Sequence, residues 1–331
     1  MSEHIKINLK YGRFLSRSEI LSLDQKLAIG DTAEIQIQPA PYHGILGLSK
    51  PQMIYRLKKV LGKDIDIKCL SNTKIKFIKV KNSRAYTDTK NAKTLIGIVS
   101  SGKNLDNIER TIVSANKMLE HKHIIISGDS IIHEKILKYD NVRIIDPCNY
   151  ISDDRFLISK KKNDIIKINE YCFDYAIIIH DHYILDDIFW TQYLEVDVNF
   201  DFLITRKRNI KSPKSAMHGE NERLILPFDR AGYLPILYPQ REKKSELHQI
   251  NGGILIGSQF AFSRLQLDEE LAWGEMEDLD FSVRSYFEGL VTKYDPEIRV
   301  LSSSNRLSPV KYEIIQILKQ YFRTLIDFIK K

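Results

Sequence analysis

Residues 94–101 of the chain are TLIGIVSS, an apolar run that ends in two small polar residues. A strand that is apolar throughout is typical of a parallel sheet covered on both faces. Residues 107–119, NIERTIVSANKML, then place apolar side chains at helical spacing. Strand-like runs recur at 121–130, HKHIIISGDS, and at 141–147, NVRIIDP, with a short helical stretch between them. The alternation predicts an α/β fold with a Rossmann-like, mainly parallel sheet.

The same alternation continues toward the C-terminus. A helix is predicted over residues 160–173, KKKNDIIKINEYCF, and a strand over 174–184, DYAIIIHDHYI. Another strand is predicted over 200–209, FDFLITRKRN. Residues 207–248 lack clear periodicity and contain several prolines and glycines, which predicts a long flexible loop or lid.

The first 90 residues follow a different pattern. Apolar and polar residues alternate in 5–9 and 33–37, as in half-buried strands, and a short helical pattern runs from Pro51 to Gly62. We therefore expect three parts: a small N-terminal α+β accessory module (residues 1–90), a catalytic domain (residues 91–308) and a basic amphipathic C-terminal helix (residues 309–331).

The composition is that of a folded protein. Of 331 residues, 43% are hydrophobic and 28% are charged, which is enough apolar material for a large core. No stretch reaches the roughly 18–20 uninterrupted apolar residues of a membrane helix, and the first residues lack the apolar core of a secretion signal. The widely spaced Cys69, Cys148 and Cys172 exclude a disulfide framework or a thiolate zinc site. We therefore expect a cytoplasmic protein.

The net charge of +7 first suggests a nucleic-acid partner. However, the lysines are scattered, and the sequence has neither an arginine-rich helix nor a basic tract interleaved with aromatic residues. We therefore expect no nucleic-acid binding. The basic C-terminal helix either packs on the domain, which we slightly favour, or forms a dimer, or lies on the anionic inner face of a membrane.

The first group of candidate site residues is His180, Asp181 and His182, where an apolar strand ends abruptly. Carboxylate and imidazole together suit Mn²⁺ and other first-row metals. A divalent metal beside a sugar nucleotide would stabilise the diphosphate as a leaving group. The alternative is a strand-end turn of solvated polar residues.

A second group of candidate residues opens the helical pattern that begins at residue 277. Glu277 and Asp278 lie in its first turn, where the helix dipole favours carboxylates in the ionised form. An ionised carboxylate can act as a general base on a hydroxyl, although acidic residues also cap ordinary helices. Asn251, Gly252 and Gly253 precede a further strand, and adjacent glycines allow either a close approach of a ligand or a simple hairpin turn.

The order of these features carries more information than any one of them. A Rossmann-like start is followed by a strand ending in an acidic triplet, a glycine pair, Trp-Gly-Glu, and EDLDFSVR at 277–284. Over residues 94–305 this order resembles the GT-A glycosyltransferases. It is most similar to branches with a W-G-x-E-D-x-(D/E)-F-x-x-R pattern, such as polypeptide GalNAc-transferases and chondroitin-type polymerases.

The resemblance implies roles for individual residues. His180–Asp181–His182 stands where the family has its Asp-x-Asp metal motif, and an Asp-x-His variant would make His182 the ligand; the implied cofactor is Mn²⁺ or Mg²⁺, with Mn²⁺ favoured. Asp278 matches the base of inverting members, Glu277 precedes it, and Arg284 would support the site or approach phosphate. If the enzyme retains configuration, the base role lapses. The implied donor contacts are Ser100, Ser101, Asp129 and Asp181, and the implied acceptor or donor-sugar contacts are Trp273 and Gly274, beside the turn of Asn251, Gly252 and Gly253. Arg206 is a further candidate donor contact, taken from the charge run that follows a predicted strand; the alternative is a solvated charged surface.

The resemblance therefore implies transfer of a sugar from a nucleotide sugar, with UDP favoured, to a hydroxyl of a glycan or lipid-linked glycan acceptor. Synthesis of a bacterial surface polysaccharide is the expected setting. Two alternatives stay open. One is a catalytically silent sugar-binding or scaffold subunit, which the unusual His-Asp-His triplet favours. The other is a nucleotidyltransferase, although the loop after the first strand has only one glycine.

Overall fold

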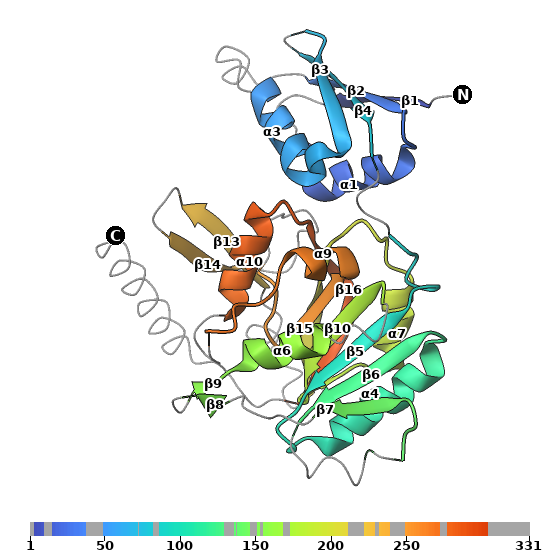
Figure 1. The fold of residues 1–331 in the computed structure, drawn as a ribbon, viewed down its shortest axis with the longest axis vertical. Coiled ribbons are helices and arrows are strands. Elements are labelled where there is room, and N and C mark those ends of the chain that lie inside the picture. The colour runs from blue at the N-terminus through green and yellow to red at the C-terminus, as the bar shows by residue number, and fades with distance from the viewer. Residues whose placement is uncertain are drawn as a thin grey trace.

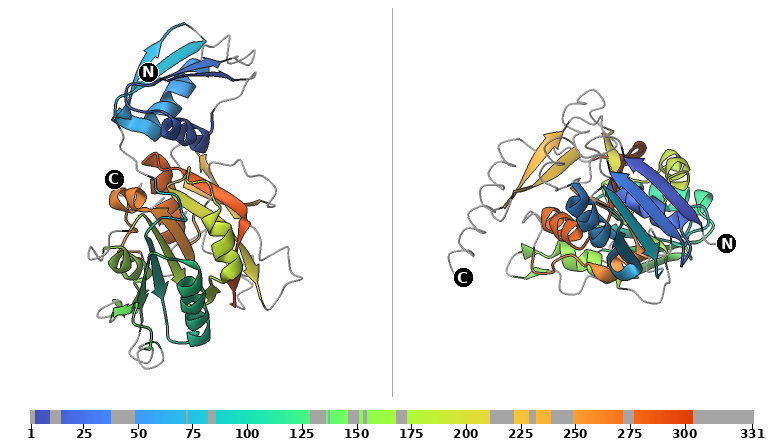
Figure 2. Two further views of the ribbon diagram at one scale, coloured as in Figure 1. Left: turned by 90° about the vertical axis from the view of Figure 1, so that its right-hand side faces the viewer. Right: turned by 90° about the horizontal axis from the view of Figure 1, so that it is seen from above.

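The protein is described by a computed structural model in which two sheets form separate bodies, a small one at the N-terminal end and a large one below it (Figures 1 and 2). The described residues are 3–9, 15–37, 49–71, 73–81, 86–128, 136, 138–145, 151–152, 155–167, 173–210, 222–228, 232–238, 249–271 and 277–303.

The large sheet has eight strands among the described residues, in the order β11-β16-β12-β15-β10-β5-β6-β7. The neighbours β10, β5, β6 and β7 are parallel, whereas β15 runs antiparallel to both β10 and β12. The predicted mixed, mainly parallel α/β sheet is therefore confirmed. Its strands are β5 (Thr94–Val99), β6 (Lys122–Ser127), β7 (Val142–Ile145), β10 (Tyr175–His180), β11 (Tyr183–Ile184), β12 (Phe202–Asn209), β15 (Ile254–Ser258) and β16 (Thr292–Ser302).

Helices cover both faces of this sheet, which explains why β5 is apolar and buried throughout. On one face pack α4 (Leu105–Met118) and α7 (Asp187–Leu194). On the other pack α6 (Ile158–Ile166), α9 (Gln259–Arg264) and α10 (Glu277–Phe287).

Helix α6 approaches the sheet closely at one glycine. A Cβ on Gly97 would lie 2.5 Å from Ile178 Cδ1 and 2.6 Å from Ile165 Cγ2, so only glycine allows the observed depth of packing. The helix ends at Ile166 and is shorter than the predicted 160–173, of which residues 168–172 lie outside the described part.

The small sheet has the order β1-β2-β4-β3, with β1 and β2 parallel and the other pairs antiparallel. The predicted strands and the helix ending before Gly62 are present, but α1 was not predicted. Its start is marked by a capping box in which Ser16 and Glu19 bond reciprocally. The elements are β1 (His4–Leu9), α1 (Arg17–Lys26), β2 (Thr32–Ile37), α3 (Ser49–Leu61), the 3₁₀ turn η1 (Gly62–Asp64), β3 (Ile65–Cys69) and β4 (Lys74–Lys79).

The segment 207–248, predicted as a long flexible loop or lid, contains regular structure. Strand β12 continues to Asn209, and β13 (Glu222–Phe228) pairs antiparallel with β14 (Gly232–Tyr238). The prolines in this segment argued against strands when the sequence was considered alone. A two-stranded ribbon tolerates proline because each strand has one unpaired edge, where no backbone N–H has to donate a hydrogen bond to a neighbouring strand. A second small pair joins β8 (Ile151–Ser152) to β9 (Arg155–Phe156).

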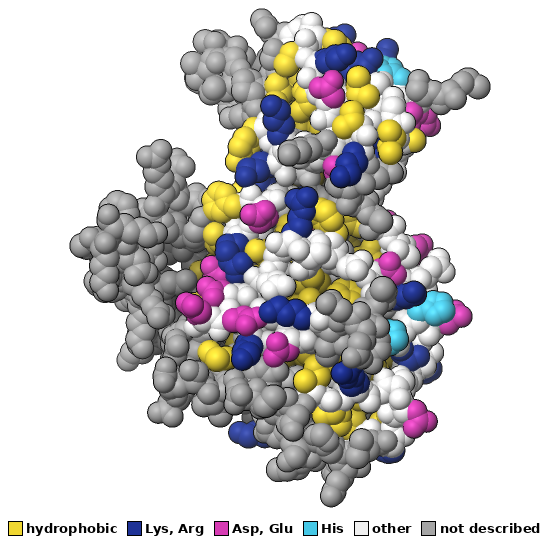
Figure 3. Space-filling model, in the orientation of Figure 1, with side chains coloured by type: hydrophobic (Ala, Val, Ile, Leu, Met, Phe, Trp, Pro, Cys, Tyr) yellow, Lys and Arg dark blue, Asp and Glu magenta, His cyan; other side chains and the backbone are white. Residues whose placement is uncertain are grey.

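The predicted C-terminal helix, residues 309–331, lies outside the described residues. Each helix that the structure does describe is too short or too polar to span a bilayer. On the face drawn in Figure 3, basic side chains of the described residues lie among acidic ones.

Candidate active site

The candidate site residues gather at one edge of the large sheet. The last residues of β5 and β10, Val99 and His180, are paired with each other, so both strands end at this edge. The first residue of β15, Ile254, is paired with Ile179 near the end of β10, so β15 begins at the same edge. The His180 amide donates to the Gly253 carbonyl over 3.0 Å, which joins the end of β10 to the glycine pair. In α/β sheets the carboxyl ends of parallel strands are the usual place for ligands.

The Asp181 carboxylate is buried and turned toward the loop after β5. Its Oδ2 accepts hydrogen bonds from Ser100 Oγ at 3.0 Å, the Ser101 amide at 2.8 Å and Ser101 Oγ at 3.1 Å. Its Oδ1 accepts from Asn104 Nδ2 at 3.0 Å, and Asn107 Nδ2 donates to the Asp181 carbonyl at 3.1 Å. This carboxylate therefore holds the loop between β5 and α4 in shape.

A metal role for Asp181 stays a prediction, and the structure shows this carboxylate bonded to the loop after β5. Three donors of the protein bond to Asp181 Oδ2 and one, Asn104 Nδ2, bonds to Oδ1, so Oδ1 keeps one acceptor position for a further partner. Within the described ranges, no three His, Cys, Asp or Glu side chains are grouped as a metal would require. The His182 ring lies 4.5 Å from the Tyr183 ring and 5.5 Å from the His180 ring, centroid to centroid. A metal role for His180 or His182 stays a prediction.

Both residues of the glycine pair approach neighbouring side chains closely, and the contact at Gly253 leaves no room for a Cβ. A Cβ on Gly253 would lie 2.5 Å from Tyr183 Cε2, and a Cβ on Gly252 would lie 3.0 Å from Asp278 Cβ. Asn251 Oδ1 accepts the Gly253 amide at 2.8 Å, which shapes the turn. The glycines therefore bring this turn against both β11 and the start of α10.

Asp278 lies in the first turn of α10, as predicted, and is only partly buried. Its Oδ2 accepts the Gly252 amide at 3.3 Å and its Oδ1 accepts the Leu279 amide at 2.9 Å. One turn further on, Ser282 Oγ donates to the Asp278 carbonyl at 2.5 Å and accepts the Ile250 amide at 2.8 Å. The carboxylate is thus held beside the glycine turn while part of it faces solvent.

Glu277 has a different environment from that of Asp278. It is buried, and its Oε1 lies 3.7 Å from the Nζ of the buried Lys162. Burial raises the pKa of the Glu277 carboxyl, and the charge of Asp278 adds to this rise, whereas the Lys162 ammonium opposes it. The helix dipole therefore does not dominate here as the sequence suggested, because burial outweighs it. Glu277 fits a structural ion pair better than a catalytic role.

Two site residues escaped the sequence reasoning, namely the consecutive Lys161 and Lys162 of α6. Lys161 Nζ donates to the Ser100 carbonyl at 3.1 Å, and Lys162 Nζ donates to the Gly252 carbonyl at 2.7 Å. Both side chains are almost completely buried. Their signal in the sequence was a run of three lysines, which is usually a solvated surface.

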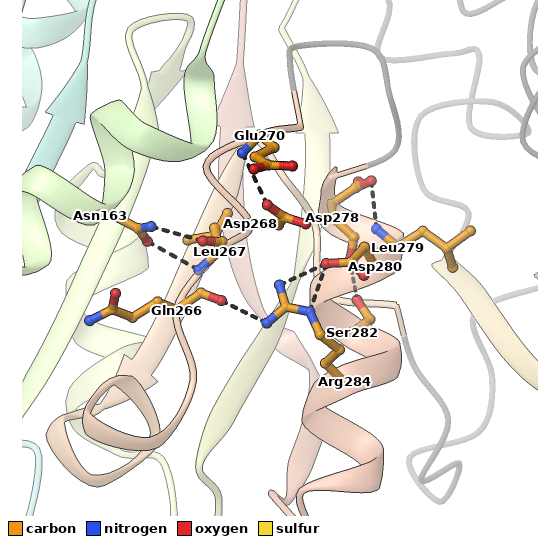
Figure 4. A network of polar contacts seen from close by, with 10 residues as sticks. All are labelled: Asn163, Gln266, Leu267, Asp268, Glu270, Asp278, Leu279, Asp280, Ser282 and Arg284. Carbon is orange, nitrogen blue, oxygen red and sulfur yellow. Dashed lines mark hydrogen bonds and ion pairs between the residues drawn. The ribbon is translucent and has the colours of Figure 1, made fainter. Parts of the chain in front are cut away.

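Arg284 does not reach the site. Its Nε donates to Asp280 Oδ2 at 2.8 Å and its Nη1 donates to the Gln266 carbonyl at 2.8 Å, within the polar network of Figure 4. Asn163 closes the same region by exchanging two hydrogen bonds with the backbone of Leu267. The F-x-x-R arginine therefore fastens α10 to the segment after α9.

The remaining candidates are only partly placed. Arg206 lies on β12 beside Arg299 of β16, and the next residue, Lys207, places its Nζ 5.2 Å from the Tyr183 ring centroid. A donor contact through Arg206 stays a prediction. Asp129, Trp273 and Gly274 lie outside the described residues.

Known proteins resemble this chain in structure but not in sequence. No protein-family model matches it, and no curated protein matches it. The chain is similar to GalNAc-T7 in complex with UDP, GalNAc and Mn²⁺, with a TM-score of 0.48, 15% identity and coverage of 75% of this chain and 51% of that one. It therefore spans about half the length of that protein.

Two further solved structures illustrate the range of similar proteins. A mannosyltransferase from Pyrobaculum calidifontis, in complex with GDP-Man and Mn²⁺, has a TM-score of 0.48 at 10% identity, over 86% of this chain and 75% of that one. The inositol-1-phosphate CTP transferase of T. maritima has a TM-score of 0.40 at 11% identity, over 69% of this chain and 96% of that one. Glycosyltransferases and a nucleotidyltransferase are thus both among the similar structures.

Proposed function

We propose that the chain is a GT-A-type glycosyltransferase that moves a sugar from a nucleotide sugar, with UDP favoured, to a hydroxyl of a glycan acceptor. The observation that carries this proposal is the position of Asp278. Its carboxylate lies at a helix N-terminus, accepts the Gly252 amide, and adjoins the edge where β5 and β10 end. This is the arrangement expected of a base held beside a ligand site.

The proposed reaction inverts the configuration of the transferred sugar. Asp278 takes the proton of an acceptor hydroxyl, and the oxygen forms a bond to the anomeric carbon as the bond to the nucleoside diphosphate breaks. The leaving diphosphate carries away the bonding electron pair. Glu277, Lys162 and the glycine turn hold Asp278 in place, so the main contribution of these residues is positioning.

A divalent cofactor, Mn²⁺ or Mg²⁺ with Mn²⁺ favoured, would be held by His180, His182 or the Oδ1 of Asp181, because Asp181 Oδ2 is already used by the loop after β5. We assign no step of the reaction to it. Asp181, Ser100 and Ser101 contribute by fixing the shape of the loop next to the donor.

The proposal is tested by measuring the melting temperature with UDP-, GDP-, CMP- and dTDP-sugars, each with Mn²⁺, Mg²⁺ or EDTA. A ligand that binds only the folded state raises this temperature. We expect one nucleotide sugar to raise it, and the same compound to release nucleoside diphosphate on incubation with an acceptor glycan.

Other outcomes would favour the alternatives. A nucleotidyltransferase would bind the free nucleoside triphosphate and release pyrophosphate with a sugar phosphate. A silent scaffold, which the internal use of Asp181 favours, would bind a sugar or nucleotide sugar without turnover. No shift with any nucleotide in a folded sample would overturn the assignment.

A further inference from the structure

The N-terminal end of the molecule contacts the far end of the helix that carries Asp278. Arg17, the first residue of α1, is only 5% exposed. Its Nη1 donates to the carbonyls of Tyr286 at 2.8 Å and of Leu290 at 3.3 Å, and its guanidinium carbon lies 3.8 Å from the Tyr286 ring centroid. These contacts join residues about 270 positions apart in the sequence.

The end of α10 is itself a defined motif. The Leu290 amide donates to the Ser285 carbonyl and the Gly289 amide donates to the Tyr286 carbonyl, with Gly289 at φ +77°. This is a Schellman motif, and its αL position favours glycine. A Cβ on Gly289 would also lie 1.9 Å from the Lys59 carbonyl oxygen of α3, so the two bodies touch without an intervening side chain.

Further contacts make this junction continuous. Lys59 Nζ donates to the Phe287 carbonyl at 2.8 Å. The side chain of Val291 is buried in the same apolar cluster as the core of the N-terminal body. On the other side, Gln25 Nε2 donates to the Val198 carbonyl at 2.8 Å and Asn199 Nδ2 donates to Ser22 Oγ at 2.9 Å.

Electrostatics suggest that Arg17 serves α10 and not its own helix. A cation at a helix N-terminus is disfavoured by the dipole of that helix, whereas a cation at a helix C-terminus is favoured. Arg17 begins α1 but lies against the last carbonyls of α10. The unfavourable interaction of Arg17 with the dipole of α1 is thus offset at α10, where the last carbonyls of the helix have no amide of the next helical turn to bond to.

We propose that Arg17 is a positioning residue, and that the N-terminal body (residues 3–81) fixes the catalytic helix by completing the C-terminus of α10. Asp278 lies one residue into this helix, which spans about 16 Å at 1.5 Å per residue. A short helix held at its far end keeps a fixed direction at its near end. The inference rests on the proposed function of Asp278, and it makes the N-terminal body part of the catalytic unit.

The test uses hydrogen–deuterium exchange of the full chain, in wild type, Arg17→Met, Arg17→Lys and the control Ile75→Val. Ile75 is buried in the core of the N-terminal body and makes no hydrogen bond to α10. We expect Arg17→Met to speed exchange severalfold in residues 277–290 and not in α4, with Arg17→Lys intermediate and the control unchanged. In hydrolysis of UDP-GlcNAc or another bound nucleotide sugar, kcat should fall roughly ten- to a hundredfold at unchanged KM.

Equal changes in α4 and α10, or no change in residues 277–290, would overturn the positioning role. If Arg17→Met does not fold, Lys59→Met removes the neighbouring donor to Phe287 and is judged by the same exchange measurement. Failure of the wild-type chain to bind or turn over any nucleotide sugar would instead overturn the proposed function, while the exchange data would still decide whether Arg17 holds α10.

Discussion

Lys162 Nζ lies 3.7 Å from Glu277 Oε1, and both side chains are removed from solvent beneath the glycine turn. Burial lowers the pKa of the Lys162 ammonium and raises that of the Glu277 carboxyl, and each charge partly offsets the change in the other. Neither charge could be buried there alone without a large free-energy cost. The pair therefore makes the start of α10 depend on the N-terminal half of α6.

Removing one partner of this pair should destabilise the protein strongly. We expect Lys162→Met to lower the free energy of unfolding by about 3–5 kcal/mol, because it leaves a buried carboxylate without its cation. The double variant Lys162→Met/Glu277→Gln should lose less than the sum of the single variants. Urea unfolding of the four proteins checks this, and simple additivity would contradict it.

The effect of Lys162→Met should also depend on pH. Glu277 has a folded-state pKa above its ordinary value of 4.5, so it contributes stability below that pH and loses it as pH rises through the folded value. Without Lys162 the folded pKa rises further. The deficit of the variant against wild type should therefore be small near pH 4.5 and grow toward pH 8, and a deficit that is constant with pH would contradict the pairing.

Replacing Asp181 by asparagine should destabilise the protein whether or not a metal is present. The amide offers fewer acceptor positions to the four donors from residues 100–104, so we expect a loss of about 1–3 kcal/mol. Melting temperatures of wild type and Asp181→Asn in EDTA measure this. An unchanged melting temperature in EDTA, together with loss of a metal-dependent shift, would instead make Asp181 a metal ligand.

A methyl group on Gly253 should disturb the turn. Its Cβ would lie 2.5 Å from the ring of the buried Tyr183, and overpacking of this kind costs about 1–3 kcal/mol. Combining Gly253→Ala with Tyr183→Leu should relieve the clash and recover part of the stability. If the loss of stability of the double variant, relative to wild type, equals the sum of the losses of the two single variants, the contact with Tyr183 is not the cause.

Asparagine at position 278 should abolish transfer and keep donor binding. Removing a general base lowers the rate by about 10²–10⁴-fold, while the isosteric amide can still accept the Leu279 amide. The matched control is Asp280→Asn, which alters a carboxylate two residues along the same helix that pairs with Arg284. Transfer rates and donor-induced shifts in melting temperature are measured for both variants. Equal losses of rate in the two variants would contradict the assignment of Asp278 as the general base.

The main sheet could be predicted because its strands are buried on both faces. Residues 95–99 and 176–179 are apolar without alternation, which leaves little room for another assignment. Helix α1 was missed although Ser16 and Glu19 form a recognisable capping box. The hairpin over 222–238 was missed because Pro227 and Pro235 resemble loop residues in a local reading.

The positions of His180, Asp181, Gly253 and Asp278 at strand and helix ends were predictable, and their chemical roles stay predictions. The site was not predictable where tertiary burial decides the role of a side chain. In the sequence, the neighbours of Lys162 are charged and polar residues, which is typical of a solvated surface. Its burial follows only from the close packing of α6 on the sheet at Gly97. Arg17 likewise has no local sign of its contact with Tyr286.

The neighbouring positions of Lys161 and Lys162 also limit how this fold can change during evolution. Successive residues point about 100° apart around a helix, and these two reach different backbone carbonyls, of Ser100 and of Gly252. A substitution of Lys161 breaks its bond to Ser100, and a substitution of Lys162 breaks its bond to Gly252 and its ion pair with Glu277. Inserting or deleting a single residue at the start of α6 would rotate both side chains away at once, so the length of this segment is constrained as well as the identity of its two lysines.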